Sequence, residues 1–378
     1  MFRTPSALSA VVILGVASCA KPPPPPPPPP PPDPLVFVEL ALGSEHACAR
    51  TEDGLVYCWG SNGFGQCANR AISKQVTPRQ VQGLGRARQI AAGGRHTCAV
   101  LDDDSIKCWG GNQHGQLGDD TTENKYEPTT VRDGSTWVSV AAGGDQTCAR
   151  KRDGTVHCWG ESQPGASVKT PMPVMGLAPM KQVSVGLAHA CARDEEGTVR
   201  CWGENYKRQL GVGKKDERGA TVTVADLQAS ELALGREHSC ARDGSGKVLC
   251  WGGGMVCVPG ERQIGRIVAV KPAPVPGMEK ATQIASGGDV TCAVLADGTV
   301  GCAQPEQKDG SCTTLQVPGV TGVAVVGVGD GFACALERGG TRIQCWGIGR
   351  SGQLGDGKAE DHKTPEPIKF PIRGVEAD

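Results

Sequence analysis

The stretch IAAGGRHTCAVLDDDSIKCWGGNQHGQLGD, residues 90–119, contains Cys98 and Cys108 with nine residues between them. A short apolar segment ending in Ala-x-Gly precedes the first cysteine, and Trp-Gly follows the second. Seven such cysteine pairs occur along the chain, with intervals of 50, 50, 43, 49, 52 and 42 residues between successive first cysteines. A fixed period of this size indicates an array of equal structural units.

The turn between the two cysteines fixes the register of a hairpin. In the first unit a three-residue loop at 52–54 places Cys48 directly opposite Cys58, within the range of a disulfide. The third loop position takes a left-handed conformation, which suits Gly54. The same position holds Asp104, Gly154, Gly197, Gly246 and Gly298 in other units.

We therefore predict seven disulfides, each within one hairpin. The pairs are Cys48 with Cys58, Cys98 with Cys108, Cys148 with Cys158, Cys191 with Cys201, Cys240 with Cys250, Cys292 with Cys302 and Cys334 with Cys345. The last pair has one extra intervening residue, so its loop should differ. The alternative of zinc binding requires cysteines two to four residues apart, so we expect these pairs not to bind zinc. No metal and no cofactor are expected.

The N-terminal segment resembles an export signal. Arg3 precedes a short apolar core at 10–16, which is too short to span a membrane, and small residues lead to Cys19. This ending resembles a bacterial lipoprotein cleavage site, which implies lipidation of Cys19. An ordinary signal peptide is the alternative. Because Ala20 rather than Asp follows the cysteine, the resemblance implies sorting to the outer membrane, facing the periplasm or the cell surface.

Eleven consecutive prolines, residues 22–32, follow Cys19 closely. Proline lacks the N–H that helices and sheets need, so polyproline II is expected, a semi-rigid spacer of roughly 35 Å. A ligand for a peptide-binding domain is the alternative. The expected organisation is a signal peptide at 1–18, a lipidated linker at 19–34 and a repeat domain at 35–378.

The repeats resemble those of the regulator-of-chromosome-condensation family. The shared pattern is Ile-Ala-x-Gly-x-x-His-x-Cys-Ala, then Asp-Gly-x-Val-x-Cys-Trp-Gly, then Asn-x-x-Gly-Gln-Leu-Gly, and residues 90–119 match almost throughout. The resemblance covers the chain from about residue 40 onward and implies an all-β, seven-bladed β-propeller. Many short strands, glycine turns and the absence of a helical period agree with this fold.

Some units depart from the pattern. The sixth has Cys302-Ala303-Gln304 in place of Cys-Trp-Gly, so we expect that blade to be irregular around 305–314. The third lacks the Gly-Gln-Leu-Gly segment and is shortened near 165–173. Most units are expected to end in a proline-containing loop, such as Thr77-Pro78. Ring closure should bring residues 35–40 and 367–372 into one shared or adjacent blade, with residues 374–378 resembling the start of another unit.

Two recurring side chains have both a structural and a functional interpretation. His46, His96, His189 and His238 lie two residues before a first cysteine and could line a channel, but other units lack them, so a hydrogen-bonded structural role is favoured. Tryptophan follows a second cysteine in six units and could stack a ligand, but packing between blades is favoured. These tryptophans are Trp59, Trp109, Trp159, Trp202, Trp251 and Trp346.

Three further cysteines follow the hairpins. Cys257 and Cys312 could form an extra disulfide, and Cys67 occupies a leucine position, where a buried free thiol is expected.

The formal charge of −1 gives no electrostatic argument for nucleic-acid binding, and no catalytic motif is present in the sequence. We predict a non-catalytic, monomeric protein-binding scaffold that contacts the membrane only through its anchor and binds an envelope or extracellular protein. Its binding loops are expected at 64–79, 113–133, 163–179, 207–226 and 255–276. The alternatives are a glycan-degrading propeller enzyme and, from the resemblance alone, nucleotide exchange on a GTPase.

Overall fold

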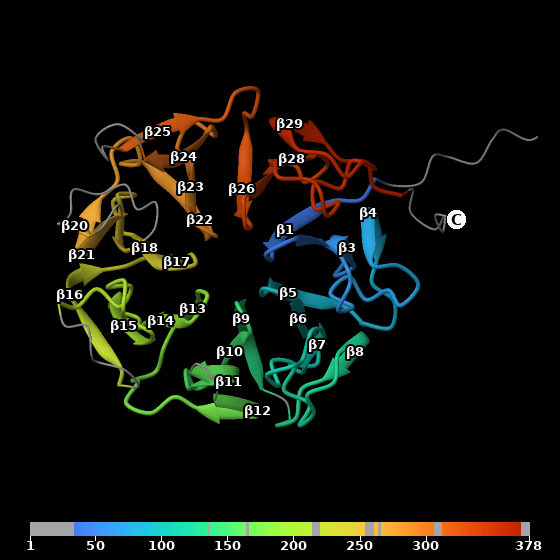
Figure 1. The fold of residues 1–378 in the computed structure, drawn as a ribbon, viewed down its shortest axis with the longest axis horizontal. Coiled ribbons are helices and arrows are strands. Elements are labelled where there is room, and N and C mark those ends of the chain that lie inside the picture. The colour runs from blue at the N-terminus through green and yellow to red at the C-terminus, as the bar shows by residue number, and fades with distance from the viewer. Residues whose placement is uncertain are drawn as a thin grey trace, which may run out of the picture. The chain divides into compact units, whose positions relative to one another are not determined.

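Seven antiparallel sheets are arranged around a central axis, one sheet for each repeat (Figure 1). The computed structural model describes residues 34–134, 136–163, 166–213, 220–253, 261–263, 266–305 and 312–371. These residues contain strands, turns and loops, and none of them is helical, so no helix among them could span a membrane. The predicted seven-bladed, all-β propeller is confirmed. The predicted signal peptide, Cys19 and the proline run lie outside the described residues.

The strands follow one another in the order of the chain. The first three blades contain β1 (Phe37–Leu42), β2 (His46–Thr51), β3 (Val56–Ser61) and β4 (Lys74–Gln80); β5 (Ala87–Ala92), β6 (His96–Leu101), β7 (Ile106–Gly110) and β8 (Lys125–Thr130); and β9 (Trp137–Gly143), β10 (Gln146–Lys151), β11 (Val156–Gln163) and β12 (Ala166–Pro173). The fourth and fifth contain β13 (Gln182–Val185), β14 (His189–Arg193), β15 (Thr198–Gly203) and β16 (Val222–Gln228); and β17 (Glu231–Leu234), β18 (His238–Arg242), β19 (Val248–Gly252), β20 (Glu261–Gln263) and β21 (Arg266–Pro274). The last two contain β22 (Ala281–Gly287), β23 (Val290–Leu295), β24 (Val300–Pro305) and β25 (Cys312–Gln316); and β26 (Val323–Val328), β27 (Phe332–Glu337), β28 (Ile343–Gly347) and β29 (His362–Pro367).

Each blade is a meander whose first strand lies nearest the axis and whose last strand lies at the rim (Figure 1). The fifth blade differs, because the short strand β20 pairs outside β21. In the third blade β11 continues nearly into β12, which is the shortening expected from the missing Gly-Gln-Leu-Gly segment. One repeat therefore corresponds to one blade throughout.

The hairpin of the second and third strands has the register that the turns imply. Thr51 donates its N–H to the carbonyl of Leu55, Gly54 has φ = 85°, and Cys48 lies opposite Cys58. The last hairpin has the longer loop expected of it, with both Gly339 and Gly340 in the left-handed region.

All seven predicted cysteine pairs are disulfides, with Cα–Cα distances of 4.0–4.1 Å. In the first three blades Cys48 is bonded to Cys58, Cys98 to Cys108 and Cys148 to Cys158. In the other four Cys191 is bonded to Cys201, Cys240 to Cys250, Cys292 to Cys302 and Cys334 to Cys345. The pairing deduced from the turns is therefore found in every blade.

The disulfides lie inside the blades, where most of their cysteines are fully buried. Because each bridge closes a loop of about eleven residues, the chain-entropy relation gives a stabilisation of about 3 kcal/mol for each. Seven bridges of this kind suit an oxidising, exported environment rather than a reducing one.

The Thr-Pro segments were wrongly predicted as loops. Thr77 and Pro78 lie in β4, where three residues of the outer strand stand opposite Trp59 alone and form a bulge. Pro128, Pro171, Pro272 and Pro365 lie at corresponding places in the second, third, fifth and seventh blades. Proline is tolerated there because a residue in the bulge of a rim strand makes no ladder hydrogen bond through its backbone nitrogen. The N–H that proline lacks is therefore not needed.

The sixth blade lacks this bulge, and its described residues do not show the irregularity expected around 305–314. Its ladder runs without interruption from Gly301 to Pro305, with Cys302 opposite Leu315 and Ala303 opposite Thr314. The part of the expected irregularity at 306–311 lies outside the described residues. The sixth blade thus lacks both Trp-Gly and the bulge with proline, whereas the fourth blade keeps Trp202-Gly203 and has its register shift between Thr198 and Arg200 instead.

The ring closes between the first and seventh blades. Phe37 of β1 and Phe370, three residues after β29, have ring centroids 4.1 Å apart, and the N–H of Phe37 donates to Gly340. Edge contacts join Phe370 to Tyr57 and Trp59. The predicted meeting of the two ends is found, in adjacent rather than shared blades, whereas residues 374–378 lie outside the described residues.

Candidate functional site

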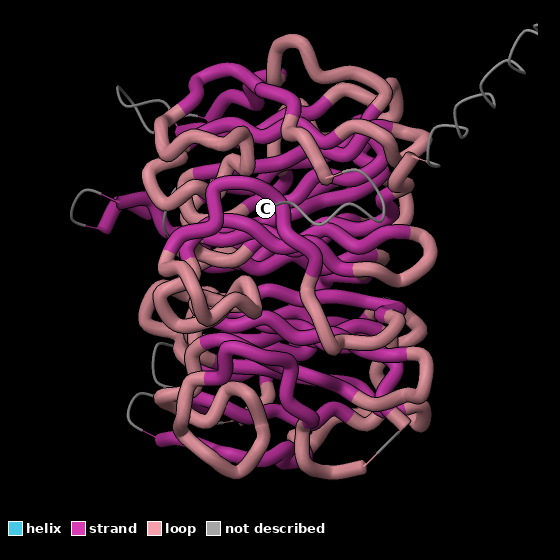
Figure 2. The backbone as a smooth tube through the Cα atoms, turned by 90° about the vertical axis from the view of Figure 1, so that its right-hand side faces the viewer, coloured by secondary structure: helices cyan, strands magenta, loops and turns pink. Residues whose placement is uncertain are grey.

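The turns after the first strands and the loops after the third strands of the blades emerge on the same side of the ring, which we call the loop face. The turns lie at 43–45, 93–95, 144–145, 186–188, 235–237, 288–289 and 329–331, and the described loops at 62–73, 111–124, 204–213 and 348–361. The opposite side, the tip face, carries the Asp-Gly turns of the hairpins. In an edge-on view the strands cross the ring between these two faces (Figure 2).

The motif Asn-x-x-Gly-Gln-Leu-Gly holds the loops of this face in place. In the second blade Asn112 accepts a hydrogen bond from the N–H of Leu117 at 3.0 Å, and Gln116 accepts one from the N–H of His114 at 2.9 Å. Leu117 itself is fully buried. The loops are therefore fixed by polar contacts within each motif and by one apolar anchor.

The tryptophans connect neighbouring blades, as predicted. Trp109 donates its indole N–H to the carbonyl of Gln66 in the preceding blade at 3.0 Å. Trp59, Trp159 and Trp251 make the same contact with Gln353, Gln116 and Gln209. Trp202 and Trp346 follow blades in which this motif is absent, and they are only half-buried.

The four recurring histidines also connect blades. The Nε2 atom of His46 lies 2.8 Å from the hydroxyl of Thr97 in the next blade, and that hydroxyl donates to the carbonyl of Gln66 at 3.0 Å. The proton between the histidine and the threonine therefore belongs to Nε2. His96, His189 and His238 contact Thr147, Ser239 and Thr291 in the same way at 2.7–2.9 Å. These histidines line no channel, because they lie buried in the seams.

Each of these histidines contacts a hydroxyl group in the next blade. Where a blade lacks the histidine, the next blade lacks the hydroxyl at the corresponding position. Gln146, Val290 and Phe332 replace histidine in the third, sixth and seventh blades. The residue that replaces the hydroxyl in the blade after each of them is alanine, namely Ala190, Ala333 and Ala47. Burial lowers the pKa of His46 and His238 to about 4. It lowers the pKa of His96 and His189 to about 3.

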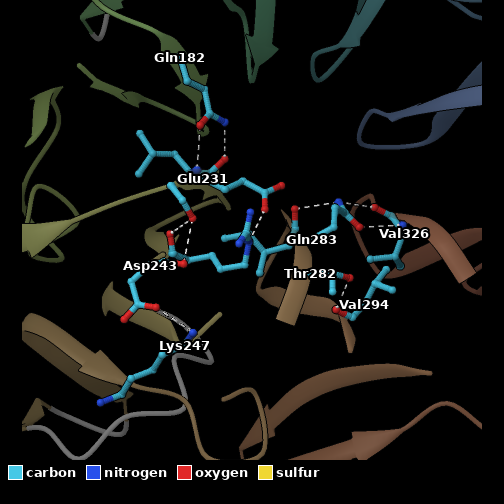
Figure 3. A network of polar contacts seen from close by, with 12 residues as sticks. Gln182, Glu231, Asp243, Lys247, Thr282, Gln283, Val294 and Val326 are labelled. Carbon is cyan, nitrogen blue, oxygen red and sulfur yellow. Dashed lines mark hydrogen bonds and ion pairs between the residues drawn. The ribbon is translucent and has the colours of Figure 1, made fainter. Parts of the chain in front are cut away.

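A third kind of seam contact joins the innermost strands. Gln182 donates to the carbonyl of Leu232 at 3.0 Å and accepts from its N–H at 3.1 Å (Figure 3). Gln283 makes the same pair of bonds with Val326, at 3.1 and 2.9 Å (Figure 3). Among the described residues, the seam between the third and fourth blades has none of the three kinds of contact.

Glutamates occupy this inner position in the first and fifth blades. Glu39 pairs with Arg50 at 2.7 Å and Glu231 with Arg242 at 2.9 Å. Burial raises the pKa of both glutamates, and the neighbouring arginines oppose that change. These pairs were not predicted from the sequence, because each is formed between two strands of an otherwise ordinary apolar pattern.

Cys67 is a buried free thiol, as expected from its leucine position. Burial raises the pKa of this thiol well above its ordinary value, so it is not a nucleophile. Cys257 lies outside the described residues, so its pairing with Cys312 stays a prediction.

The central channel opens on the loop face in a cavity of about 240 Å³ lined by the glycine-rich turns. Arg236 and Asp330, from the fifth and seventh blades, form an ion pair across it. The lining consists mainly of small residues and backbone. A ligand in the mouth of the channel would therefore meet mostly backbone N–H and C=O groups and few functional side chains.

Several side chains on the loop face have the chemistry of a binding surface. Arg95 stacks over Phe64, with its guanidinium carbon 4.8 Å from the ring centroid, and Arg70 lies 5.6 Å from the Tyr126 ring. Tyr206 is 43% exposed, and the apolar side chains of Leu187 and Ile348 are exposed to a similar extent.

The structure also brings together His114, Asp145 and Glu161 on this face. Their ligand-type atoms all lie within 4.8 Å of one another. This cluster was not predicted from the sequence, because its members come from two repeats and occupy positions that vary from one blade to the next. No signal in a single repeat could have identified it.

The predicted binding segments include the described loops of the loop face but extend beyond them, and their role in binding stays a prediction. The segments 64–79 and 113–133 each begin in a loop and continue into a rim strand, β4 or β8. The segment 207–226 likewise begins in a loop and continues into β16, whereas 163–179 begins at the end of β11 and contains β12, and 255–276 contains β20 and β21. These three segments also contain the residues 164–165, 214–219, 255–260 and 264–265, which lie outside the described residues.

Comparison with known sequences identifies the repeat. Residues 53–100 and 103–150 match the family described as regulator of chromosome condensation (RCC1) repeat, and 37–66, 87–116 and 180–209 match a second description of the same repeat. The chain contains RCC1 repeats. No protein of curated function matches the sequence significantly.

Solved structures of RCC1-type and other propellers resemble the fold. Prp20p from Saccharomyces cerevisiae, described with its binding to Gsp1p and histones, has a TM-score of 0.74 at 21% identity, covering 90% of this chain and 88% of Prp20p. Human WBSCR16 has a TM-score of 0.56 at 17% identity, with coverage of 90% and 84%. The ectodomain of the Arabidopsis thaliana receptor kinase ACR4 has a TM-score of 0.55 at 19% identity, with coverage of 90% and 100%. At these identities the likeness shows the fold of the RCC1 repeats alone.

Proposed function

We propose that the protein is a non-catalytic, monomeric scaffold that binds another protein through its loop face. The observation that carries this proposal is the combination of exposed aromatic, apolar and arginine side chains with loops held by Asn and Gln contacts. Aromatic and arginine residues supply most of the energy at protein interfaces, and loops that are already ordered lose little entropy on binding. Prp20p, which shares the fold, is described as binding proteins, and this supports the proposal.

The partner is an envelope or extracellular protein, since the seven disulfides suit an exported chain. The composition, with 39 basic and 40 acidic residues, does not favour nucleic acid as the partner.

The test compares the loop face with the tip face. The full chain with its disulfides formed is cross-linked in an envelope extract of the source organism, and the captured protein is purified and its affinity measured. Phe64→Ala with Tyr206→Ala should weaken binding by at least about tenfold, because hot-spot aromatics contribute more than 1.4 kcal/mol.

Glu52→Ala with Asp102→Ala on the tip face is the matched control and should leave the affinity unchanged. An equal loss of affinity in both variants, or a captured protein whose affinity neither variant changes, would contradict the proposed surface. The melting temperature of every variant is compared with that of the parent, so that a loss of affinity is not mistaken for a loss of fold.

We further propose that Cys19 is lipidated and tethers the propeller to the outer membrane through the proline segment. The apolar core and the small residues before Cys19 support this anchor. The wild-type chain should sediment with membranes and incorporate labelled fatty acid, whereas Cys19→Ser should do neither. Membrane association that survives this substitution would rule out the lipid anchor.

A further inference from the structure

Three side chains of metal-ligand type converge where the second and third blades meet on the loop face. His114 comes from the loop after β7, Asp145 from the turn after β9, and Glu161 from the end of β11. One ligand atom from each lies within 4.8 Å of those of the other two, and all three residues are half-buried. Three separate backbone segments therefore present an imidazole and two carboxylates to one point.

We propose that His114, Asp145 and Glu161 bind a divalent transition-metal cation of the Zn²⁺ class. Zinc is held in proteins by imidazole and carboxylate at about 2.0–2.2 Å, and sites with three protein ligands keep a fourth position for water or another ligand. Ligands on a tetrahedral ion at that distance lie about 3.4 Å apart. Small side-chain rotations therefore suffice to close this cluster on an ion.

The backbone and the neighbouring amide fix the positions of these ligands. Gln116 accepts a hydrogen bond from the N–H of His114 at 2.9 Å and donates Nε2 to the Asp145 carboxylate at 2.8 Å. The N–H of Glu161 donates to the carbonyl of Asp145 at 2.9 Å. A hydrogen-bonded carboxylate on a metal is an oriented ligand, so Gln116 would serve as an outer-shell partner.

The imidazole has a nitrogen to spare. Nδ1 of His114 lies 3.4 Å from the hydroxyl of Ser167, and a histidine that uses one nitrogen in a hydrogen bond can ligate with the other. With two carboxylates close by, a divalent cation would relieve the repulsion between two negative charges.

The cluster is specific to this seam. At the seam between the first and second blades, the corresponding residues are Phe64, Arg95 and Gly111; between the fourth and fifth, they are Lys207, Glu237 and Gly253. In the first of these seams Arg95 stacks on Phe64, and in the second the side chain of Lys207 lies beside Gly253, so each carries a cation of the chain itself. The set His-Asp-Glu is therefore not part of the repeat framework.

One of the other histidines of the chain supplies a matched control for the metal-binding test. Four of the seven are buried in the blade seams, and His362 pairs with Asp356 at 2.9 Å on the loop-face side of the seventh blade. His362 thus offers a histidine–carboxylate pair that is not part of a three-ligand group found among the described residues.

Equilibrium dialysis of the full, disulfide-bonded chain tests the site. After removal of metal with a chelator, the chain is dialysed against Zn²⁺, and bound metal is measured; one equivalent per chain is expected. His114→Ala and Glu161→Gln should each weaken binding by more than about tenfold, since even outer-shell changes cost 10–100-fold. With Co²⁺ as the probe, visible absorption bands of nitrogen and oxygen ligation should appear in the parent and vanish in His114→Ala.

His362→Ala should retain the equivalent and the Co²⁺ bands. Retention of the metal by His114→Ala, its loss from His362→Ala, or binding of Ca²⁺ as tight as that of Zn²⁺ would each overturn the assignment. Near-ultraviolet circular dichroism of every variant shows that a loss of metal is not a loss of fold.

Discussion

Lowering the pH from 7.5 to 5 is expected to reduce the free energy of unfolding by about 8 kcal/mol, because four buried histidines must stay neutral in the native ring. An unfolded histidine titrates near pH 6.5, whereas those in the seams titrate at about 3 or 4. Between these values the unfolded chain binds protons that the native chain does not. The stabilisation is fully present above pH 6.5 and is lost as the pH falls toward 4, by about 2 kcal/mol for each histidine at pH 5.

The geometry explains why the native histidines resist protonation. Nε2 of His46 already donates to Thr97, so the second proton would go to Nδ1, which is buried without a hydrogen-bond partner. Only His238 has a carboxylate near enough to oppose the effect, that of Asp289, which raises its pKa slightly against the dominant influence of burial.

Burial also lowers the pKa of His157, which adds to the loss in the same direction. Carboxyl groups act in the opposite direction or at lower pH. Burial raises the pKa of Glu39 and Glu231, so protonation of these two offsets part of the loss. Hydrogen bonds to Ser105 and Thr299 lower the pKa of Asp103 and Asp297, which therefore matter only below about pH 4. The window between pH 6.5 and 4 is dominated by the seam histidines.

The chain itself supplies the matched variant. His96→Gln with Thr147→Ala copies the pair Gln146 and Ala190 that the third and fourth blades already use. Urea unfolding at pH 7.5 and 5 should show that this double variant loses about 2 kcal/mol less than the parent. An identical pH dependence of the double variant and the parent would contradict the assignment.

The hairpins and the blade number were predictable because their determinants are local. The register of Cys48 and Cys58 depends on a three-residue turn between them, and that turn lies within one repeat. Cys67 was recognised by its departure from a repeated leucine position. Each of these signals is contained in a few consecutive residues.

The seam contacts were only partly predictable because they join different repeats. A structural role was expected for His46, but its partner Thr97 is 51 residues away, and the correlation between the two positions appears only once the blades are placed side by side. Thr77-Pro78 was predicted to be a loop because proline is rare inside strands. The bulge opposite Trp59 that accommodates this proline depends on the pairing of two strands, so a short stretch of sequence does not show it. The cluster of His114 with Asp145 depends likewise on two blades meeting.

Ending the chain after Glu366 should unfold the propeller or lower its melting temperature sharply, because the closure of the ring would be lost. This truncation removes Ile368, which is 8% exposed and donates its N–H to Ile343, and Phe370, which stacks on Phe37. Removing one buried aliphatic and one half-buried aromatic side chain costs about 5 kcal/mol together, a large part of the stability of an ordinary domain. In a ring, an open seam also exposes the faces of two blades to water, so the loss should be cooperative.

Two further chains separate closure from mere shortening. A chain ended after Pro371 keeps both side chains and should melt like the full chain, whereas Phe370→Ala at full length should lose about 2–3 kcal/mol. Among the residues that the structure describes, the seam between the third and fourth blades has none of the three kinds of polar contact described above. An opened ring should therefore separate there next, and hydrogen exchange should be faster in β9 and β13 than in β1 and β5. A chain ended after Glu366 that melts like the full chain would show that the aromatic contacts of Phe370 do not hold the ring closed.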